Sequence, residues 1–284
     1  MKGINMEKSI HDSINKRNIK LDGTNNFRDL GGYIGHNGKM VKFKQLFRSD
    51  ALHKLSSNDV TWLESMGLKT IIDFRSSSEI VNNEDKEIRG AKYYHLNPKA
   101  EVAQTASASL SNDRSKIEKL VSIANSKEGE SYFADHIDDM SKQMRKLVSD
   151  PDAITQYQKV MAFLVNNETP LVFHCRGGKD RTGIAAMFIL IALGVSKAQI
   201  YDDYLFTNIN NVIRNEKRMN DYRNLTDNQL VLDYLYNLQL AKPEYLDAAF
   251  DEMIKMSGTT ENYIKEVLKV TDEQLVAIQN RFLK

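Results

Sequence analysis

A short apolar segment, a loop with two glycines and a long apolar segment follow one another between residues 170 and 193. The first, Leu171 to His174, has the length of a buried strand. The last, Thr182 to Leu193, reads TGIAAMFILIAL and is apolar on all sides, which predicts a helix enclosed by the rest of the protein. A buried strand joined by a tight loop to a buried helix favours a layered α/β fold.

The rest of the chain alternates strand candidates with helices. Further strand candidates lie at residues 32–34, 40–43, 45–48, 69–74 and 92–96. Capping boxes at Ser56 and Asp59 and at Ser76 and Glu79 each predict the start of a helix. We therefore expect a central, mostly parallel sheet of about four to five strands, flanked by helices and followed by a helical C-terminal region from residue 196.

Two segments depart from this alternation. Residues 1–22 form a polar lead-in, and residues 98–150 are polar and rich in Ala, Ser and Lys, which predicts a partly helical insertion or lid. A long helical region is expected over residues 132–148 and an amphipathic helix over 152–166. A chain of 284 residues could form one large domain or two small ones, and we expect residues 1–284 to form a single domain.

Composition excludes several classes of protein. The single cysteine cannot form an internal disulfide, so a disulfide-stapled secreted scaffold is excluded. The net charge of +1 gives no general attraction to nucleic acid. No apolar run approaches the ~18 residues that a membrane span needs, so no stable membrane insertion is expected. We expect a monomer that is cytoplasmic, or secreted if a signal sequence has been removed, since none is visible.

The loop between strand and helix reads HCRGGKDRTG, residues 174–183, and holds the only cysteine of the chain. Gly177 and Gly178 allow successive backbone N–H groups to converge on an anion, and the N-terminus of the next helix adds about half a positive charge. Cys175 lies at the start of this field, which favours its thiolate, a strong nucleophile. A Walker phosphate loop is excluded, because the Gly-Lys pair is followed by Asp instead of Ser or Thr.

Three further side chains of this loop suit phosphate chemistry. Arg181, six positions after Cys175, can hold two oxygens of a phosphate with its guanidinium. Thr182 can donate its hydroxyl to the sulfur when the sulfur leaves, and His174 is expected to steady the thiolate rather than to transfer a proton. The pattern predicts that Cys175 attacks phosphorus and forms a cysteinyl-phosphate, which water hydrolyses. Since the histidines lack metal-ligand spacing, we expect no metal and no cofactor.

The loop resembles the signature of cysteine-dependent protein tyrosine phosphatases, and its Gly-Lys-Asp-Arg-Thr-Gly form is similar to the bacterial PtpB/LipA-like atypical branch. Other blocks that resemble this branch are NFRDLGGY (26–33), LFRSDAL (46–52), IIDFRSSSE (71–79), DYLFTN (203–208) and ENYIKEVLKVTDEQL (261–275). The resemblance extends over residues 23–284, with 98–150 non-diagnostic. It implies the cysteine-phosphatase fold and hydrolysis of phosphotyrosine, with phosphoserine, phosphothreonine and phosphoinositides as further substrates.

The reaction also needs a carboxylic acid that protonates the leaving group and then activates water. Classical tyrosine phosphatases carry this aspartate on a Trp-Pro-Asp loop, but Trp62 is followed here by Leu63 and Glu64, so that loop is missing. Asp180, inside the phosphate loop, is the best candidate, and the resemblance supports it. Asp73 is the alternative, with orientation of the loop as its expected role.

Basic residues set the expected substrate range. Arg176 and Lys179 stand where phosphoinositide phosphatases of this superfamily often carry basic residues, so the resemblance implies tolerance of highly charged substrates, with phosphoinositides as an alternative primary substrate. Arg28, Arg48 and Arg75 could each contact phosphate or brace the loop.

The helical segments 132–148 and 203–224 are expected to cover the cleft. The basic run at residues 214–223 within the second segment is expected to be a solvated helix face, with an edge that meets acidic substrate as the alternative.

Two rival functions remain open from the sequence. Sulfur transfer by a rhodanese-like protein also uses a loop cysteine, although loop lengths there differ from the five residues between Cys175 and Arg181. A phosphate-binding protein without activity is disfavoured, because the cysteine, the arginine and the acid are all present.

Overall fold

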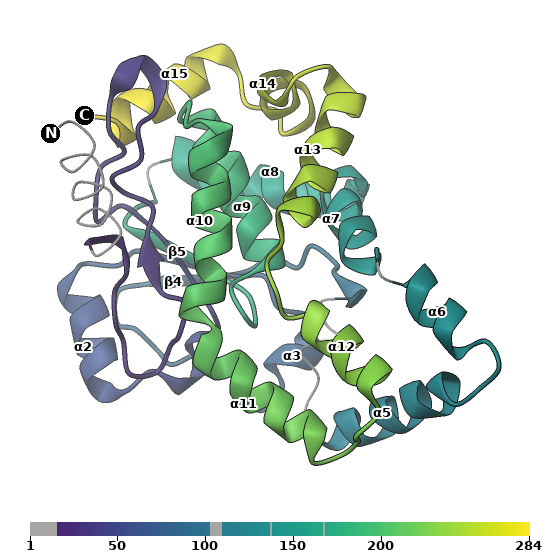
Figure 1. Ribbon diagram of the computed structural model, residues 1–284. Helices are drawn as coiled ribbons and strands as arrows, with labels where there is room; N and C mark the ends of the chain where they lie inside the picture. The colour runs from purple at the N-terminus through teal and green to yellow at the C-terminus, as the bar shows by residue number, and fades with distance from the viewer. Residues whose placement is uncertain (1–15, 103–109, 137, 167) are drawn as a thin grey trace, which may run out of the picture.

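The described residues form one five-stranded sheet in the order β1-β2-β5-β3-β4. A computed structural model describes residues 16–102, 110–136, 138–166 and 168–284 (Figure 1). The strands are β1 (Arg28–Asp29), β2 (Leu46–Ser49), β3 (Thr70–Asp73), β4 (Lys92–His95) and β5 (Leu171–His174). Only the β1–β2 pair is antiparallel, and the other three pairs are parallel. This confirms the predicted α/β fold with a mostly parallel sheet.

Helices cover the sheet and make up the C-terminal region. Their bounds are α2 (Ser57–Ser65), α3 (Ser77–Ile80), α5 (Leu110–Ala124), α6 (Gly129–Asp135), α7 (Asp139–Ser149), α8 (Pro151–Val165), α9 (Asp180–Ala192), α10 (Lys197–Asn210), α11 (Val212–Arg223), α12 (Gln229–Asn237), α13 (Pro243–Ser257), α14 (Thr260–Asn262) and α15 (Asp272–Phe282). Short 3-10 turns lie at His36–Gly38 and Leu52–Lys54, and a π-helical turn lies at Tyr263–Val267. None of the helices described has the length and apolar character that crossing a bilayer requires.

Adjacent residues of the central strands pack into different cores. In β5, Phe173 belongs to the main core and Val172 to a second core beneath α2. In β3, Ile72 and Ile71 divide in the same way. Side chains alternate between the two faces of a strand, so both faces of this sheet are buried. The near-continuous apolar runs in the sequence follow from this double burial.

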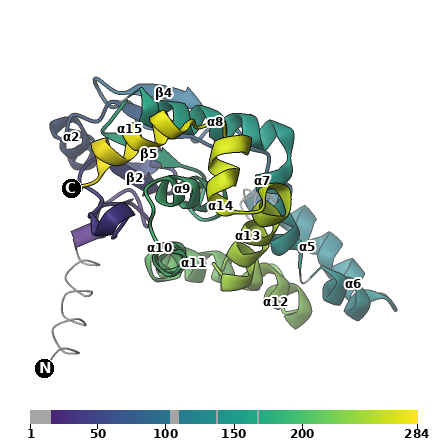
Figure 2. The ribbon, with the colours of Figure 1, turned by 90° about the horizontal axis from the view of Figure 1, so that it is seen from above.

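Helix α9 is the centre of the main core. Every residue from Asp180 to Ala192 is buried, and the helix contacts β2, β5, α7, α8 and α10. Figure 2 shows α9 enclosed between the sheet and α10. Its apolar sequence has no polar face because no side of it meets solvent.

The insertion packs against the helices α11 and α12 and makes a third, smaller core. Side chains from α5 and α6, including Ile117 and Phe133, contact Met219, Tyr222 and Leu235 of α11 and α12. These four helices lie together along the lower part of Figure 1. Part of the insertion and most of the lead-in, residues 103–109 and 1–15, lie outside the described residues.

Several expected elements differ in the structure. Residues 32–34 and 40–43 are not strands but make isolated bridges, Ile34 with Met40 and Val41 with Leu283, because the backbone of residues 40–42 pairs with the C-terminal end of the chain instead of the sheet. The helical region expected over residues 132–148 consists of two helices, α6 and α7. Strand β1 was not predicted, since two residues carry no alternating pattern.

The packing of Phe188 provides a test of this core. Its ring lies 5.2 Å from that of Tyr157 and 5.4 Å from that of Tyr263, and it is 1% exposed. Phe188→Ala is expected to lower the free energy of unfolding by about 3–5 kcal/mol, because the cavity cannot close, as measured by urea denaturation. The control Val276→Ala, at a position that is 55% exposed, should change it by less than about 0.5 kcal/mol. Equal losses in the two variants would contradict this packing.

Candidate active site

The loop of residues 175–179 connects β5 to α9 at the carboxyl end of the parallel strands. Its turn requires glycine at one position. Gly178 has φ +64°, and a Cβ atom there would lie 2.5 Å from the backbone oxygen of Ser49. Only glycine allows this backbone conformation together with so close an approach.

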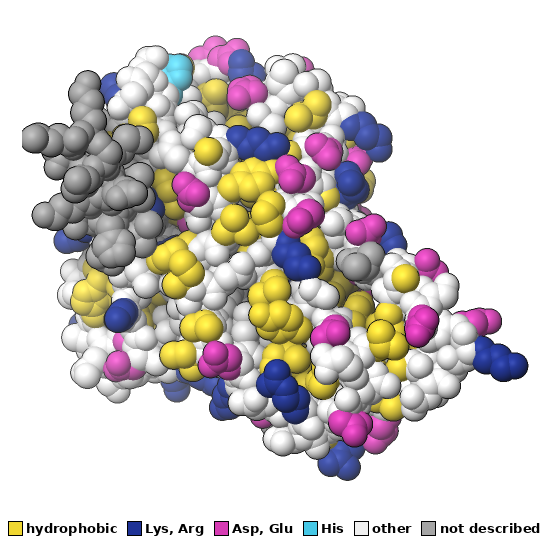
Figure 3. Space-filling model, in the orientation of Figure 1, with side chains coloured by type: hydrophobic (Ala, Val, Ile, Leu, Met, Phe, Trp, Pro, Cys, Tyr) yellow, Lys and Arg dark blue, Asp and Glu magenta, His cyan; other side chains and the backbone are white. Residues whose placement is uncertain are grey.

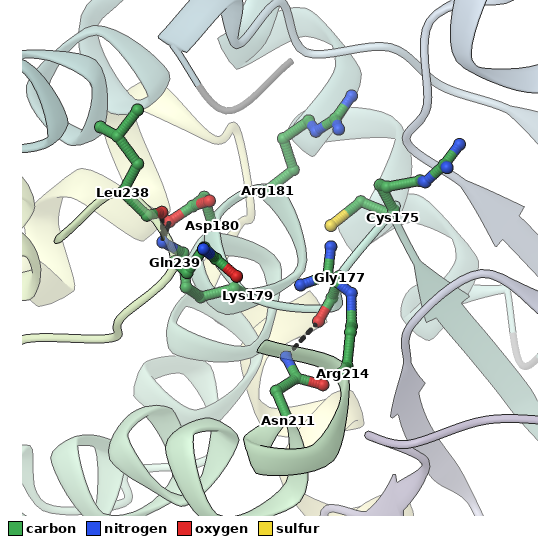
Figure 4. Close-up of a pocket in the computed structure, with 10 residues that line it drawn as sticks. Cys175, Gly177, Lys179, Asp180, Arg181, Asn211, Arg214, Leu238 and Gln239 are labelled. Atoms are coloured by element: carbon green, nitrogen blue, oxygen red, sulfur yellow. Dashed lines mark hydrogen bonds and ion pairs between the residues drawn. The ribbon is translucent and has the colours of Figure 1, made fainter. Parts of the chain in front are cut away.

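A small cavity of about 30 Å³ lies within the curve of this loop (Figure 4). The residues that line it are Cys175, Arg176, Gly177, Lys179, Asp180, Arg181, Asn211, Arg214, Leu238 and Gln239. Cys175 is 4% exposed, and in Figure 4 its sulfur points toward the guanidinium of Arg214. Asn211 at the start of α11 donates to the backbone oxygen of Gly177 at 2.9 Å. The N-terminal end of α11 and residues 238–239 therefore close one side of the cavity.

Arg181 is fixed by a carboxylate that the sequence analysis did not assign to the site. Its guanidinium donates to both oxygens of Glu79 at 2.7 Å and to the backbone oxygen of Phe74 at 2.8 Å. Burial opposes both charges, but each partner favours the other, so the pKa of Glu79 is lowered and that of Arg181 is raised. The Nε of Arg181 is buried without a hydrogen-bond partner among the described residues. This leaves one donor of the guanidinium available.

His174 lies in a buried network with two carboxylates. Its Nε2 is 2.8 Å from Asp85 and its Nδ1 is 3.8 Å from Asp73. Burial lowers the pKa of His174, but the charges of Asp85 and then Asp73 outweigh this and raise it to about 9. The imidazole is therefore cationic at neutral pH, directly before Cys175.

His174, Asp73 and Asp85 have the spacing of a metal site, but Arg75 forms ion pairs with both carboxylates. Arg75 donates to the two oxygens of Asp73 and to Asp85, at 2.8–3.0 Å. A cation in this position, beside a cationic His174, makes the cluster an ion-pair network. Asp73, the alternative acid, is thereby engaged with Arg75 and does not line the cavity of Cys175.

Asp180 and Thr182 lie in the first turn of α9. Asp180 is 6% exposed and lines the cavity. One of its carboxylate oxygens has no hydrogen-bond partner among the described residues, although it lies 3.4 Å from the ammonium of Lys179. The Thr182 hydroxyl is buried and likewise without a partner in the described part of the chain. Both groups are thus available to a bound substrate.

Lys179 was expected to meet substrate directly, but its ammonium is directed elsewhere. It donates to the backbone oxygens of Leu238 at 2.6 Å and Leu240 at 3.0 Å. Burial lowers its pKa. In this geometry Lys179 ties the phosphate loop to residues 238–240.

Arg28 and Arg48 were named as possible phosphate ligands or braces, and the structure places both behind the loop. Both guanidiniums pair with Asp203 of α10, and all three side chains are buried. Arg48 also donates to the backbone oxygen of Gly178 at 2.7 Å, as Asn26 does at 3.1 Å. Neither arginine lines the cavity of Cys175. The geometry therefore favours bracing.

The basic run at residues 214–223 contributes more than the expected solvated face. Arg214 is partly buried and lines the cavity of Cys175, beside Arg176. Burial lowers the pKa of Arg214. The only signal for it in the sequence was the basic run itself, which does not say which of its side chains turns inward.

The raised pKa of His174 predicts that stability depends on pH. Unfolded histidine has a pKa of about 6.5, so the stabilisation is fully present below about pH 6.5 and is lost as pH rises through about 9, to a limit of about 3 kcal/mol. Asp85→Asn removes the strongest supporting charge and should flatten this fall. Urea denaturation across this range measures both. The exposed control Asp251→Asn should retain the wild-type profile, and an unchanged profile in Asp85→Asn would contradict the network.

Comparison with known proteins agrees with this geometry. Residues 19–284 match the model of the family described as "Tyrosine phosphatase family". The chain is 26% identical over 260 residues to a Cupriavidus necator protein named "Putative tyrosine-protein phosphatase H16_A0669", covering 92% of this chain and 87% of that one. It is also 26% identical over 196 residues to the "Triple specificity protein phosphatase PtpB" of Mycobacterium tuberculosis, covering 66% of this chain and 68% of the relative. Cys175, Arg181 and the glycine-containing loop line one cavity in a chain matched over nearly its whole length, and the protein belongs to the tyrosine phosphatase family.

Proposed function

We propose that the protein hydrolyses phosphotyrosine without a metal, through a cysteinyl-phosphate on Cys175. The observation that carries this proposal is the cavity at the start of α9, where Cys175 and Arg181 share one wall with the loop backbone. The N-terminus of α9 and the cationic His174 flank Cys175 in the chain and supply positive charge to a site that must hold a phosphate. The free Nε of Arg181 supplies a donor for a phosphate oxygen.

The reaction proceeds in two displacements. The Cys175 thiolate attacks phosphorus, an S–P bond forms, and the P–O bond to the tyrosyl oxygen breaks as Asp180 gives that oxygen its proton. Asp180 then accepts a proton from water, whose oxygen attacks phosphorus and breaks the S–P bond. The Thr182 hydroxyl stabilises the departing thiolate, and inorganic phosphate leaves.

The substrate range extends, in this proposal, to phosphoserine, phosphothreonine and phosphoinositides. Arg176 and Arg214 support it, since both line the cavity and neither makes an ion pair with a carboxylate in the described residues. The relative from Mycobacterium tuberculosis carries the name of a triple specificity phosphatase. Highly charged substrates would meet a cationic wall here.

The nucleophile is tested by Cys175→Ser. With EDTA present, wild-type protein should hydrolyse a phosphotyrosine peptide, and the variant should lose at least about 10³-fold in kcat while still binding inorganic phosphate. Phosphoserine peptide and a phosphoinositide panel, run beside it, measure the substrate range. If wild-type protein binds phosphate but turns over nothing, the chain is a docking protein. Thiosulfate turnover with a persulfide on Cys175 would instead establish sulfur transfer.

The acid is tested by comparing Asp180→Asn with Asp73→Asn. Asp180→Asn should lower kcat for phosphotyrosine by about 10²–10³-fold, because general acid catalysis is lost. The loss should be far smaller for an aryl phosphate with an acidic phenol, whose oxygen leaves without a proton. Asp73→Asn should show no such dependence on the leaving group. The reverse pattern would assign the acid to Asp73.

A further inference from the structure

A second and larger cavity, of about 450 Å³, adjoins the active site. It is lined by Gly23, Asn25, Asp50, Ala51, His53, Lys54, Asn83, Arg176, Ile213, Arg214, Lys217, Arg218 and Asp221. We refer to it as the basic cavity. Arg176 and Arg214 also line the cavity of Cys175, so the two spaces share a wall made of these two side chains.

The basic cavity concentrates positive charge in a protein that is nearly neutral. Five of its lining side chains are cationic and two are carboxylates, whereas the whole chain carries a net charge of +1. One carboxylate, Asp50, is committed to the backbone N–H groups of Asn25 and Asn26 at 3.0–3.1 Å. Asp50 keeps its charge and favours the charged form of Arg214, so the local excess is that of five cations over two carboxylates.

The arginines of the shared wall repel one another. The pKa of Arg176 is lowered by burial first and then by the charges of Arg214 and Arg218, which outweigh the opposing charge of Glu79. The Arg176 guanidinium makes no hydrogen bond or ion pair with the described residues. Burial and then the charges of Arg176 and Lys54 also lower the pKa of His53 to about 4, so this imidazole is neutral, and its buried Nδ1 has no partner among the described residues. Grouping like charges costs free energy unless an anion joins them.

We propose that the basic cavity binds a second phosphate group carried by the same small substrate whose first phosphate lies over Cys175. The shared arginine wall implies that the two phosphates are close, as on adjacent carbons of a polyol ring. The ring would come from a lipid headgroup or from the free polyol phosphate. Lys54 and Lys217 are exposed, line only the basic cavity, and select for the second phosphate. This inference rests on the proposed function.

A phosphopeptide and a membrane surface each fit these observations less well than a small polyol phosphate does. Successive phosphotyrosines hold their phosphates much farther apart than one shared wall allows. The apolar side chains Ile209, Val212 and Ile213, at the end of α10 and the start of α11, are exposed. Figure 3, however, shows hydrophobic groups interspersed with charges of both signs over the face that it draws. A discrete cationic cavity is better matched by a discrete anion.

The experiment measures kcat/KM for an inositol monophosphate and for the vicinal inositol bisphosphate, with wild-type protein. The bisphosphate should be preferred about tenfold or more. Lys54→Ala and Lys217→Ala should each reduce this ratio about fivefold. Lys69→Ala is the matched control, since this exposed lysine precedes β3 at the opposite end of the strand, and it should retain the ratio. Thermal denaturation confirms that each variant is folded.

The outcomes separate this inference from the proposed function. Normal turnover of an aryl phosphate without a bisphosphate preference, or with a preference that the lysine variants retain, would overturn the second-phosphate site alone. The same headgroup presented on a diacylglycerol in phosphatidylcholine vesicles distinguishes the source. Equal ratio losses in both forms support headgroup recognition, whereas a loss confined to vesicles, or to a doubly phosphorylated peptide, would overturn it. No turnover of any phosphate ester would refute the proposed function itself.

Discussion

The phosphate loop depends on one buried carboxylate that lies between two guanidiniums. Asp203 of α10 pairs with Arg28 and Arg48, and Arg48 and Asn26 in turn hold the backbone oxygen of Gly178. In a trans peptide the N–H points opposite to the C=O. Fixing the Gly178 carbonyl therefore turns the N–H of the same peptide bond, that of Lys179, to the opposite side of the loop. Removing one partner from such a buried group is costly, because the remaining charges are left without compensation.

The cationic side chains around the cavity of Cys175 are not all paired with carboxylates. Arg181 is neutralised by Glu79, and His174 by Asp85 and Asp73. Arg176 and Arg214 make no ion pair with a carboxylate in the part of the chain that the structure describes, so the positive charge that remains lies in the wall that these two side chains line. A chain with a net charge of +1 can thus attract phosphate esters through local fields rather than through its overall charge.

The sequence was most informative where physical requirements are local. The apolar run of α9, the glycine loop and the capping boxes were predicted because each depends on neighbours in the chain. The partners of the loop were not, because they come from distant segments. Glu79 was interpreted only as a capping residue, since nothing in its surroundings signals that it also meets Arg181, 102 positions away. Lys179 was expected to face substrate. Its bond to Leu238 could not be foreseen, because it depends on tertiary packing.

The insertion is connected to the chemistry through α11. One side of this helix, at Met219 and Tyr222, packs into the small core that α5 and α6 complete. The start of the same helix supplies Asn211, which holds the Gly177 carbonyl, and Arg214, which lines the cavity. A helix moves as a rigid unit, because its backbone hydrogen bonds join every turn. The packing of a segment far from Cys175 in sequence therefore sets where Arg214 of α11 lies at the cavity.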